Sequence, residues 1–419
     1  MTSEDRYIQK RKSKAFFHSL AYRACRIFPI KKNRITVVTF EGRGGFCCNP
    51  KYIIEEMHRR NPDLEIYWLV NDMSKQFPSY IKKREETLWN RAYYLSTSKL
   101  WIDNYRKPLG TLKRKGQYYI NTWHAGLGLK NIGMWRGKGF SKIAHLVSKR
   151  DSELIDYVVT DSKWAKEYFV KGLVYDGPIK VIGQAREDIL YGDRSEIKHI
   201  IKSTYNVSDD VKVVLYAPTF REKGQKTNRS VYEEDTTLDK QRVLKNLEEK
   251  TGEKWVMFER LHPQIVAARK KNAVKSETGV IDVSQWDEAD EVIAASDMLI
   301  TDYSSMAFDA GCNGIPVFLY ADDLDEYRKN RGDLSFDISS DAVISANHEV
   351  TPNINAIIPF PVAQDNDQIE KQIREFDPAK YADAIRKMNE DLGYIGDGRG
   401  SERAAELAEE LMGRSSLSS

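Results

Sequence analysis

The sequence predicts an α/β fold built from two parallel-sheet halves that face each other across a cleft. The chain has 419 residues, of which 41% are hydrophobic, so it is too long for one ordinary domain and can bury two cores. Short β-rich runs alternate with helical patterns, which is typical of parallel sheets with crossover helices. A polar stretch over about residues 191–210 separates the two series of strands.

The β-rich runs give the expected strands. In the first half these are Ile35–Phe40, Leu64–Val70, Leu100–Asp103, Tyr118–Thr122, Tyr157–Thr160 and Ile179–Ile182. In the second half they are Val211–Ala217, Trp255–Glu259, Val280–Val283, Met298–Thr301 and Pro316–Tyr320, with helical patterns over Leu238–Lys250, Asp287–Ala295 and Ser305–Asn313. Open parallel sheets bind ligands beyond the carboxyl ends of their strands, so the residues just after each strand are the candidates for chemistry.

The N-terminal segment is strongly basic. Residues 1–34 hold ten Lys or Arg and two acidic residues, which leaves the rest of the chain with a net charge of −5 against a total of +3. Apolar residues recur at helical spacing in this segment: Phe16, Phe17, Leu20, Ala21, Ala24, Ile27 and Phe28. We expect a basic amphipathic helix on an anionic membrane surface, because no stretch approaches the roughly 18 apolar residues needed to span a bilayer. A solvated helix that packs its apolar stripe on the body is the alternative.

Composition narrows the cellular setting. Cys25, Cys47, Cys48 and Cys312 show neither zinc-ligand spacing nor a disulfide framework, and the chain does not begin with a secretory leader pattern. These features favour a peripheral protein on the cytoplasmic face of the cell membrane. A nucleic-acid partner is not expected, since the body beyond residue 34 is slightly acidic and a nucleic-acid footprint should be a basic face of the folded domain. An adaptor that acts only through its basic N-terminus stays an alternative.

Two segments of the second half predict an anion site. Asp302, Ser304 and Ser305 follow the expected strand Met298–Thr301 and open a helix, and a helix N-terminus with two serine hydroxyls can donate hydrogen bonds to a phosphate. The alternative is a purely structural role, in which one serine only caps the helix. Arg260 and His262 follow the strand Trp255–Glu259 at alternate positions, so both could face one anionic group.

One segment of the first half predicts a general base. His124 follows the strand Tyr118–Thr122, within a stretch whose glycines leave room for a ligand, and histidine titrates near neutral pH. Lys130 and Arg136 come shortly after, with Trp123 beside the histidine, which suits an acceptor that carries phosphate and sugar. A glycine turn with a solvated basic face is the alternative.

Five segments in order resemble the CDP-glycerol glycerophosphotransferase family, whose enzymes prime and polymerise teichoic acids and related polyol-phosphate chains. The matching residues are Trp123-His124 through Lys130 and Gly133, Tyr216-Ala217-Pro218-Thr219-Phe220-Arg221, Arg260-Leu261-His262-Pro263, Thr301-Asp302-Tyr303-Ser304-Ser305, and Asp397-Gly398 followed by Arg403. The resemblance extends over about residues 35–405. Ala125 departs from the family pattern, because it interrupts what is usually a direct His-Gly pair.

The resemblance implies a GT-B-like architecture with two Rossmann-like domains. We expect a membrane-association segment at 1–34, an acceptor domain at 35–195, a CDP-donor domain at 196–380 and a helical segment at 381–419. His124 would be the base and, with His262, catalytic; Arg260, Asp302, Ser304, Ser305, Thr219 and Arg221 would bind the donor, and Trp123, Lys130 and Arg136 the acceptor.

The implied reaction moves glycerol phosphate from CDP-glycerol to a hydroxyl of a lipid-linked saccharide or polyol-phosphate acceptor and releases CMP. A CDP-ribitol donor, or a nucleotide sugar used by a GT-B glycosyltransferase, is the alternative. The sequence shows no acidic metal-ligand cluster of obvious spacing, so we predict no cofactor and no dedicated metal site; a magnesium ion carried by the donor is compatible with this reading.

Overall fold

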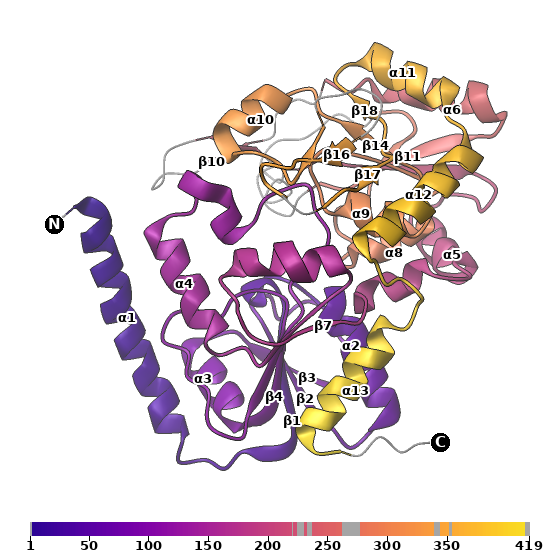
Figure 1. Ribbon diagram of the computed structural model, residues 1–419. Helices are drawn as coiled ribbons and strands as arrows, with labels where there is room; N and C mark the ends of the chain where they lie inside the picture. Colours follow the sequence, from indigo (N-terminus) through magenta and orange to yellow (C-terminus); the bar gives the residue numbers. More distant parts are fainter. Residues whose placement is uncertain are drawn as a thin grey trace. The chain divides into compact units, whose positions relative to one another are not determined.

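The computed structural model describes residues 2–219, 237–261, 277–338, 344–351 and 354–414, together with the backbone of 221–223 and 230–232. The chain forms two compact units (Figure 1). Unit 1 comprises Met1–Gly126, Ile132–Asp188 and Ile395–Ser419, and unit 2 comprises Leu127–Asn131 and Ile189–Tyr394. The chain passes from one unit to the other after residues 126, 131, 188 and 394, whereas the sequence suggested boundaries at 195 and 380.

Unit 1 contains a seven-stranded parallel sheet in the order β3-β2-β1-β4-β5-β6-β7. Its strands are β1 (Lys31–Val38), β2 (Glu65–Val70), β3 (Ile81–Glu85), β4 (Ser98–Asp103), β5 (Tyr118–Asn121), β6 (Tyr157–Thr160) and β7 (Ile179–Val181). The central strands are almost wholly buried, which explains their continuous apolar runs. The six expected strands are present, and β3 is an additional edge strand.

The helices of unit 1 are α1 (Ser3–Cys25), α2 (Cys48–Arg60), α3 (Leu88–Thr97), α4 (Lys142–Ser152) and α13 (Gly400–Met412). Short helical turns are η1 (Phe40–Gly42), η2 (Gly133–Gly139), η3 (Ala165–Phe169), η4 (Val170–Leu173) and, reaching into unit 2, η5 (Ala185–Leu190). The C-terminal helix α13 packs on α2, where Asn61 donates to the Glu409 carboxylate at 2.5 Å and Arg414 pairs with Asp63 at 2.7 Å.

Unit 2 contains a six-stranded parallel sheet in the order β12-β11-β8-β13-β14-β18. Its strands are β8 (Lys212–Ala217), β11 (Trp255–Glu259), β12 (Val280–Asp282), β13 (Met298–Thr301), β14 (Val317–Tyr320) and β18 (Val362–Ala363). Two small antiparallel sheets contain β9 (Arg221–Lys223) with β10 (Ser230–Tyr232), and β15 (Phe336–Asp337) with β16 (Ile344–Ala346) and β17 (Ile357–Ile358). The helices are α5 (Ser195–Thr204), α6 (Lys240–Thr251), α8 (Ala289–Ala295), α9 (Met306–Cys312), α10 (Leu324–Arg331), α11 (Asn366–Glu375) and α12 (Pro378–Leu392).

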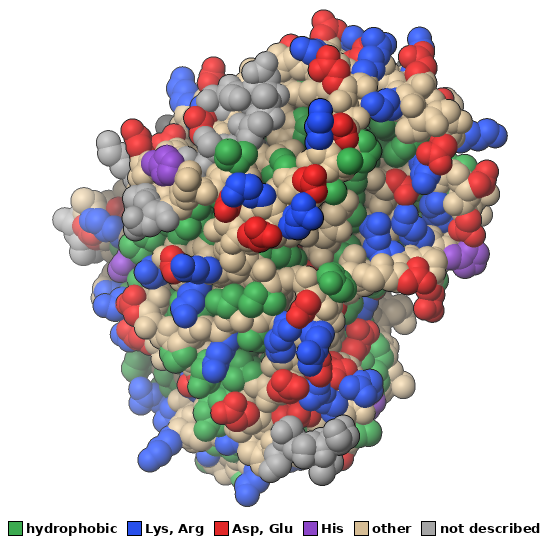
Figure 2. Space-filling view, turned by 45° about the vertical axis from the view of Figure 1, so that its right-hand side comes forward, with side chains coloured by type: hydrophobic (Ala, Val, Ile, Leu, Met, Phe, Trp, Pro, Cys, Tyr) green, Lys and Arg blue, Asp and Glu red, His purple; other side chains and the backbone are tan. Residues whose placement is uncertain are grey.

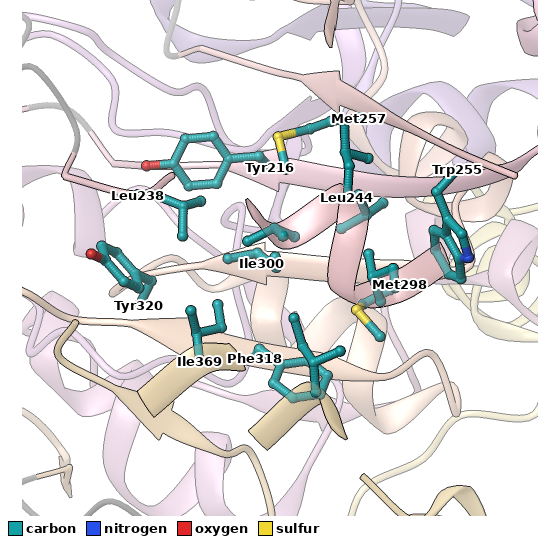
Figure 3. Close-up of a cluster of buried hydrophobic side chains, with 14 of the residues drawn as sticks. Tyr216, Leu238, Leu244, Trp255, Met257, Met298, Ile300, Phe318, Tyr320 and Ile369 are labelled. Carbon is teal, nitrogen blue, oxygen red and sulfur yellow. The ribbon is translucent and has the colours of Figure 1, made fainter. Parts of the chain in front are cut away.

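The core of unit 2 lies between one face of this sheet and helices α6 and α11 (Figure 3). Met257 and Ile300 project from neighbouring parts of the sheet, and Leu244 and Ile369 cover them from α6 and α11. Burial of such side chains contributes roughly 1.5–3 kcal/mol each, so this layer fixes the sheet whose strand ends carry the expected donor residues.

Two polar segments of the sequence contain regular structure. The stretch over residues 191–210 lies between the two series of strands, as expected, and contains α5, which packs on α8 within unit 2. The basic segment 1–34 extends into the sheet of unit 1, because β1 begins at Lys31 and Arg34 is buried in a 2.9 Å ion pair with Glu65. The helical part of that segment is α1 alone.

Candidate functional site

Each sheet has the doubly wound strand order that creates a switch point, between β1 and β4 in unit 1 and between β8 and β13 in unit 2. A hydrogen bond crosses each switch point from a backbone amide to a side chain. The Phe40 amide donates to Asn104 Oδ1 at 2.8 Å, and the Thr219 amide donates to Asp302 Oδ1 at 3.0 Å. Both points therefore lie where a Rossmann-like sheet binds its ligand, and the candidate residues gather around them.

In unit 1, His124 is enclosed by aromatic rings. Its ring centroid lies 4.5 Å from that of Trp123, 5.3 Å from Phe40 and 5.7 Å from Tyr105. The Nδ1 atom is 2.9 Å from the carbonyl oxygen of Asn104. Because a carbonyl oxygen only accepts, Nδ1 carries the proton and Nε2 of the neutral ring keeps its lone pair.

The surroundings keep this imidazole neutral. Burial lowers the pKa of His124 to about 4, the hydrogen bond to Asn104 opposes this shift, and the nearby guanidinium groups of Arg186 and Arg106 reinforce it. At neutral pH the ring can accept a proton at Nε2, as a general base must.

A buried polar network supports the histidine loop. Asn49, in the first turn of α2, donates to the carbonyl oxygen of Trp123 at 3.5 Å and to the side chain of Gln184, and its Oδ1 accepts from the Arg186 amide at 3.1 Å. Arg186 is only 4% exposed and directs Nη1 to the sulfur of Cys48 at 3.9 Å. The segments after β5 and β7 are thus joined through the start of α2.

Backbone strain collects at the same place. Six described residues other than glycine have positive φ, and four of them belong to the loops described above: Phe40 (48°), Glu41 (58°), Cys48 (61°) and Trp123 (49°). Such conformations cost of order 1–3 kcal/mol each and persist where the surroundings enforce them, often at functional sites. The strain supports a functional role for the loops around His124.

Gly126 is held against a carboxylate at the end of β6. A Cβ added at this position would overlap the side-chain oxygens of Asp161. The glycine that the structure requires is therefore at 126, one position after Ala125, and the departure from the family pattern keeps a glycine in the turn.

The expected acceptor residues have different surroundings. Trp123 is 7% exposed and packs beneath His124. Lys130 lies in the short segment that the loop after β5 contributes to unit 2. There it forms an isolated antiparallel β-bridge with Leu334, and the Ser335 amide donates to the Leu129 carbonyl at 2.8 Å. Arg136 lies on η2, close enough to Arg106 for their like charges to interact.

In unit 2, Asp302 organises the switch point. It is buried, and besides the Thr219 amide it accepts from the Thr219 hydroxyl at 2.8 Å and from the Tyr303 amide at 2.6 Å. Asp302 therefore positions the Thr219 turn, and its expected contact with the donor stays a prediction.

Ser304 and Ser305 lie at the start of α9, as the sequence suggested. The Ser304 hydroxyl accepts from the Met306 amide at 3.3 Å, and the next two amides, of Ala307 and Phe308, bond to the serine carbonyls. The N-cap residue of α9 is Ser305, whose side chain makes no capping hydrogen bond, whereas the Ser304 hydroxyl takes up one amide of the first turn. Because these amides are already bonded, the two serines would meet a phosphate chiefly through their hydroxyl groups.

Arg260 follows β11, the neighbour of β8, so Arg260, Thr219 and Ser304 lie at the carboxyl ends of three adjacent strands. The Arg260 guanidinium donates to the carbonyl of Trp286 at 2.5 Å and thereby holds the loop after β12. His262 and the side chain of Arg221 lie outside the described residues, so their roles stay predictions.

Sequence reasoning missed the residues of the β1/β4 switch point: Phe40, Asn104, Tyr105 and Arg106. Strand order makes these loops neighbours, although Phe40 and Asn104 are 64 positions apart. The available signal was the glycine-rich run after β1, which contains Gly42, Gly44 and Gly45.

Comparison with known proteins places these features in a family. The sequence profile described as CDP-Glycerol:Poly(glycerophosphate) glycerophosphotransferase matches residues 20–410. The chain is 29% identical over 338 residues to the teichoic acid poly(glycerol phosphate) polymerase of Bacillus subtilis strain 168, covering 78% of this chain and 43% of that protein. It is 24% identical over 410 residues to the polymerase of the same description from Bacillus spizizenii, covering 94% and 96%.

The chain spans less than half the length of two of the curated relatives that it matches. Among solved structures, a variant of the wall teichoic acid polymerase TagF matches with a TM-score of 0.76 and 24% identity, covering 99% of each chain. This likeness, with the two parallel sheets, establishes the GT-B-like α/β fold.

Replacing Gly126 with alanine should destabilise the protein, because the added methyl group would overlap Asp161. We expect a loss of about 1–3 kcal/mol in the free energy of unfolding, measured with denaturant. Gly139→Ala is the matched control, since its nearest neighbouring atom would be 3.8 Å from the new Cβ, and its effect should stay within about 0.5 kcal/mol. Equal losses in the two variants would refute the close packing.

The His124 imidazole should stay neutral down to about pH 4 in the free protein. Because its folded pKa lies below the unfolded value of about 6.5, only the unfolded chain binds this proton between those values, and stability is lost as the pH falls through that window. In a ¹⁵N-histidine NMR titration, the signal that is missing in His124→Asn should show no protonation between pH 8 and 5.5. A midpoint near 6.5 would contradict the buried environment.

Proposed function

Because the chain belongs to the CDP-glycerol:poly(glycerophosphate) glycerophosphotransferase family, we propose that it transfers glycerol phosphate from CDP-glycerol to a hydroxyl group of a lipid-linked acceptor. The product is a teichoic acid or a related cell-surface polymer, and the leaving group is CMP. The observation that carries the proposal is a neutral, aromatic-enclosed histidine with a fixed tautomer at the carboxyl end of β5.

His124 supplies the base in this proposal. Nδ1 is held by the Asn104 carbonyl, so Nε2 accepts the proton of the acceptor hydroxyl as its oxygen attacks the β-phosphorus of the donor. The new bond joins that oxygen to phosphorus, and the bond from phosphorus to the bridging oxygen breaks, so CMP departs with the electron pair. Binding of anionic phosphate near Arg106 and Arg186 would offset their charges and raise the pKa of His124 toward the working pH.

Unit 2 supplies donor contacts in this proposal. The Ser304 and Ser305 hydroxyls and the Thr219 turn lie at the carboxyl ends of β13 and β8, where a Rossmann-like sheet binds nucleotide phosphates. Arg260 holds the neighbouring loop, and His262 is the second proposed catalytic residue.

Ribitol phosphate is the alternative transferred group. The relatives include the poly(ribitol-phosphate) polymerase of Bacillus spizizenii, which is 25% identical over 416 residues and covers 96% of this chain and 60% of that protein.

Donor choice is tested by incubating the protein with CDP-glycerol, CDP-ribitol or a UDP-sugar and measuring the released nucleotide. We expect CMP from CDP-glycerol in the presence of acceptor. His124→Ala should lower turnover at least about 100-fold, because a general base contributes roughly 10²–10⁴-fold. His199→Ala, at an exposed position on α5, is the control and should keep normal turnover. Nucleotide release from UDP-sugars alone would overturn the proposed function.

We also propose that α1 holds the protein on the cytoplasmic face of the membrane, where a lipid-linked acceptor would be available. No helix in the described ranges is both long enough and apolar enough to span a bilayer. One face of α1 packs on the body through Tyr22 and Cys25, whereas Phe16, Phe17 and Leu20 on the other face are 57%, 66% and 44% exposed. Ile27, just beyond the helix, is also exposed, and Lys10, Lys12, Lys14 and Arg23 provide exposed cations along it.

This arrangement combines the two interpretations drawn from the sequence. Ala21, expected in the apolar stripe, is buried with Tyr22, while the remaining aromatic residues stay at the surface. Elsewhere basic and acidic side chains are interspersed over the face that Figure 2 presents. A surface that is both apolar and cationic is the combination that anionic lipid favours.

Phe16→Ser combined with Phe17→Ser should weaken binding to vesicles that contain anionic lipid, measured by co-sedimentation, at least about tenfold. Turnover on a soluble acceptor should be unchanged, because these side chains face away from the body. Trp89→Ser, an exposed aromatic residue on α3, is the control. Unchanged vesicle binding in the double variant would exclude α1 as the membrane contact.

A further inference from the structure

Arg106 lies near His124 and forms no ion pair with any residue that the structure describes. It follows β4 and is half-buried, with its guanidinium carbon 5.1 Å from the centroid of the Trp123 ring. Its Nε atom is buried and has no hydrogen-bond partner, and no carboxylate in the described part of the chain lies within ion-pair distance. Lys107, the next residue, pairs with Asp103 in the buried interior.

The acidic residues nearest to Arg106 are engaged elsewhere. Glu41 pairs with Arg43 at 2.5 Å, and Asp151 accepts from the Lys107 amide at 2.9 Å. Burial raises the pKa of Asp151 to about 7, although the charges of Lys107 and Arg106 act to lower it. Asp151 and Glu41 thus attract Arg106, but neither forms an ion pair with it among the described residues.

Further positive charge acts near this position. Burial lowers the pKa of Arg106 and repulsion from Arg136 adds to that shift, whereas Tyr105, Asp151 and Glu41 oppose it. The charge of Arg186, which is paired with Glu187 at 3.7 Å, also lowers the pKa of His124. The side-chain amide nitrogen of Asn104 is also buried with no hydrogen-bond partner. Even a half-buried cation beside a like charge is costly unless an anion completes the site.

We infer that Arg106 binds a phosphate group of the substrate beside His124, with Arg136 as a second contact. This inference rests on the proposed function and extends it to a residue that the sequence did not single out. The phosphate belongs either to the diphosphate of the donor or to the terminal phosphodiester of the acceptor. A planar guanidinium stacked on Trp123 suits either source, because its donors can bind two phosphate oxygens together.

The test compares the wild-type protein with Arg106→Gln, Arg106→Lys and the control Arg59→Gln, which removes an exposed cation paired with Glu56 on α2. Calorimetry measures binding of CDP-glycerol and of inorganic pyrophosphate, initial rates give the KM for an acceptor that ends in a phosphodiester, and Tm is recorded for each protein. We expect Arg106→Gln to change one of two quantities about 10- to 100-fold. A higher Kd for the donor assigns the phosphate to the donor, and a higher KM for the acceptor assigns it to the acceptor.

The Tm of Arg106→Gln should not fall, because the variant removes a half-buried charge that forms no ion pair with a described residue. Arg106→Lys keeps the charge but loses the planar guanidinium that can bind two phosphate oxygens. Its ligand affinity should therefore lie between those of the glutamine variant and the wild type. Donor affinity, pyrophosphate affinity and acceptor KM that all match wild type in Arg106→Gln would overturn the inference, and so would a lowered Tm with equal loss of every ligand. A wild-type protein that binds pyrophosphate through Arg106 but releases no CMP would instead refute the proposed function.

Discussion

The architecture of the site depends on one constraint of the doubly wound sheet. Where the strand order reverses, the backbone leaving the first strand and the backbone leaving the fourth turn away from each other and leave a crevice. In each unit a side chain from the fourth strand reaches back across that crevice, Asn104 to the Phe40 amide and Asp302 to the Thr219 amide. These bonds fix the loops on which the remaining candidate residues lie.

In unit 1 the same residue that crosses the switch point also sets the chemistry of the histidine. Asn104 uses its side-chain oxygen for Phe40 and its main-chain oxygen for His124, so one residue determines both the loop geometry and the tautomer. The left-handed conformations of Phe40 and Trp123 bring their rings against the imidazole. Strain, burial and tautomer are thus parts of a single arrangement.

Much of the fold could be read from the sequence, because buried parallel strands are short apolar runs. The exceptions have physical reasons. In β3 only Ile81 is buried, so the run Ile81–Glu85 looks like a polar loop, and β18 is two residues long. Helix α5 was not among the expected helices, because its stretch is largely polar and Ile201 is one of its few buried apolar residues.

The site was only partly predictable. His124 and Ser304 lie a few residues after expected strands, so position along the chain made them candidates, whereas Thr219 became one through the family resemblance. Phe40, Asn104 and Arg106 become neighbours only through the strand order β1-β4-β5, which periodicity does not reveal. The absence of an ion-pair partner for Arg106 within the described chain also required coordinates, since Asp103 is close in sequence but pairs with Lys107.

We propose that substrate phosphates bind at the carboxyl ends of both sheets, around the two switch points. Hydrogen–deuterium exchange with and without CDP-glycerol can detect this binding, because ligand contact slows local opening. We expect added protection in peptides covering residues 39–46, 104–107 and 123–126 and residues 218–219 and 302–306. Protection confined to other segments, with these loops exchanging as in the free protein, would contradict it.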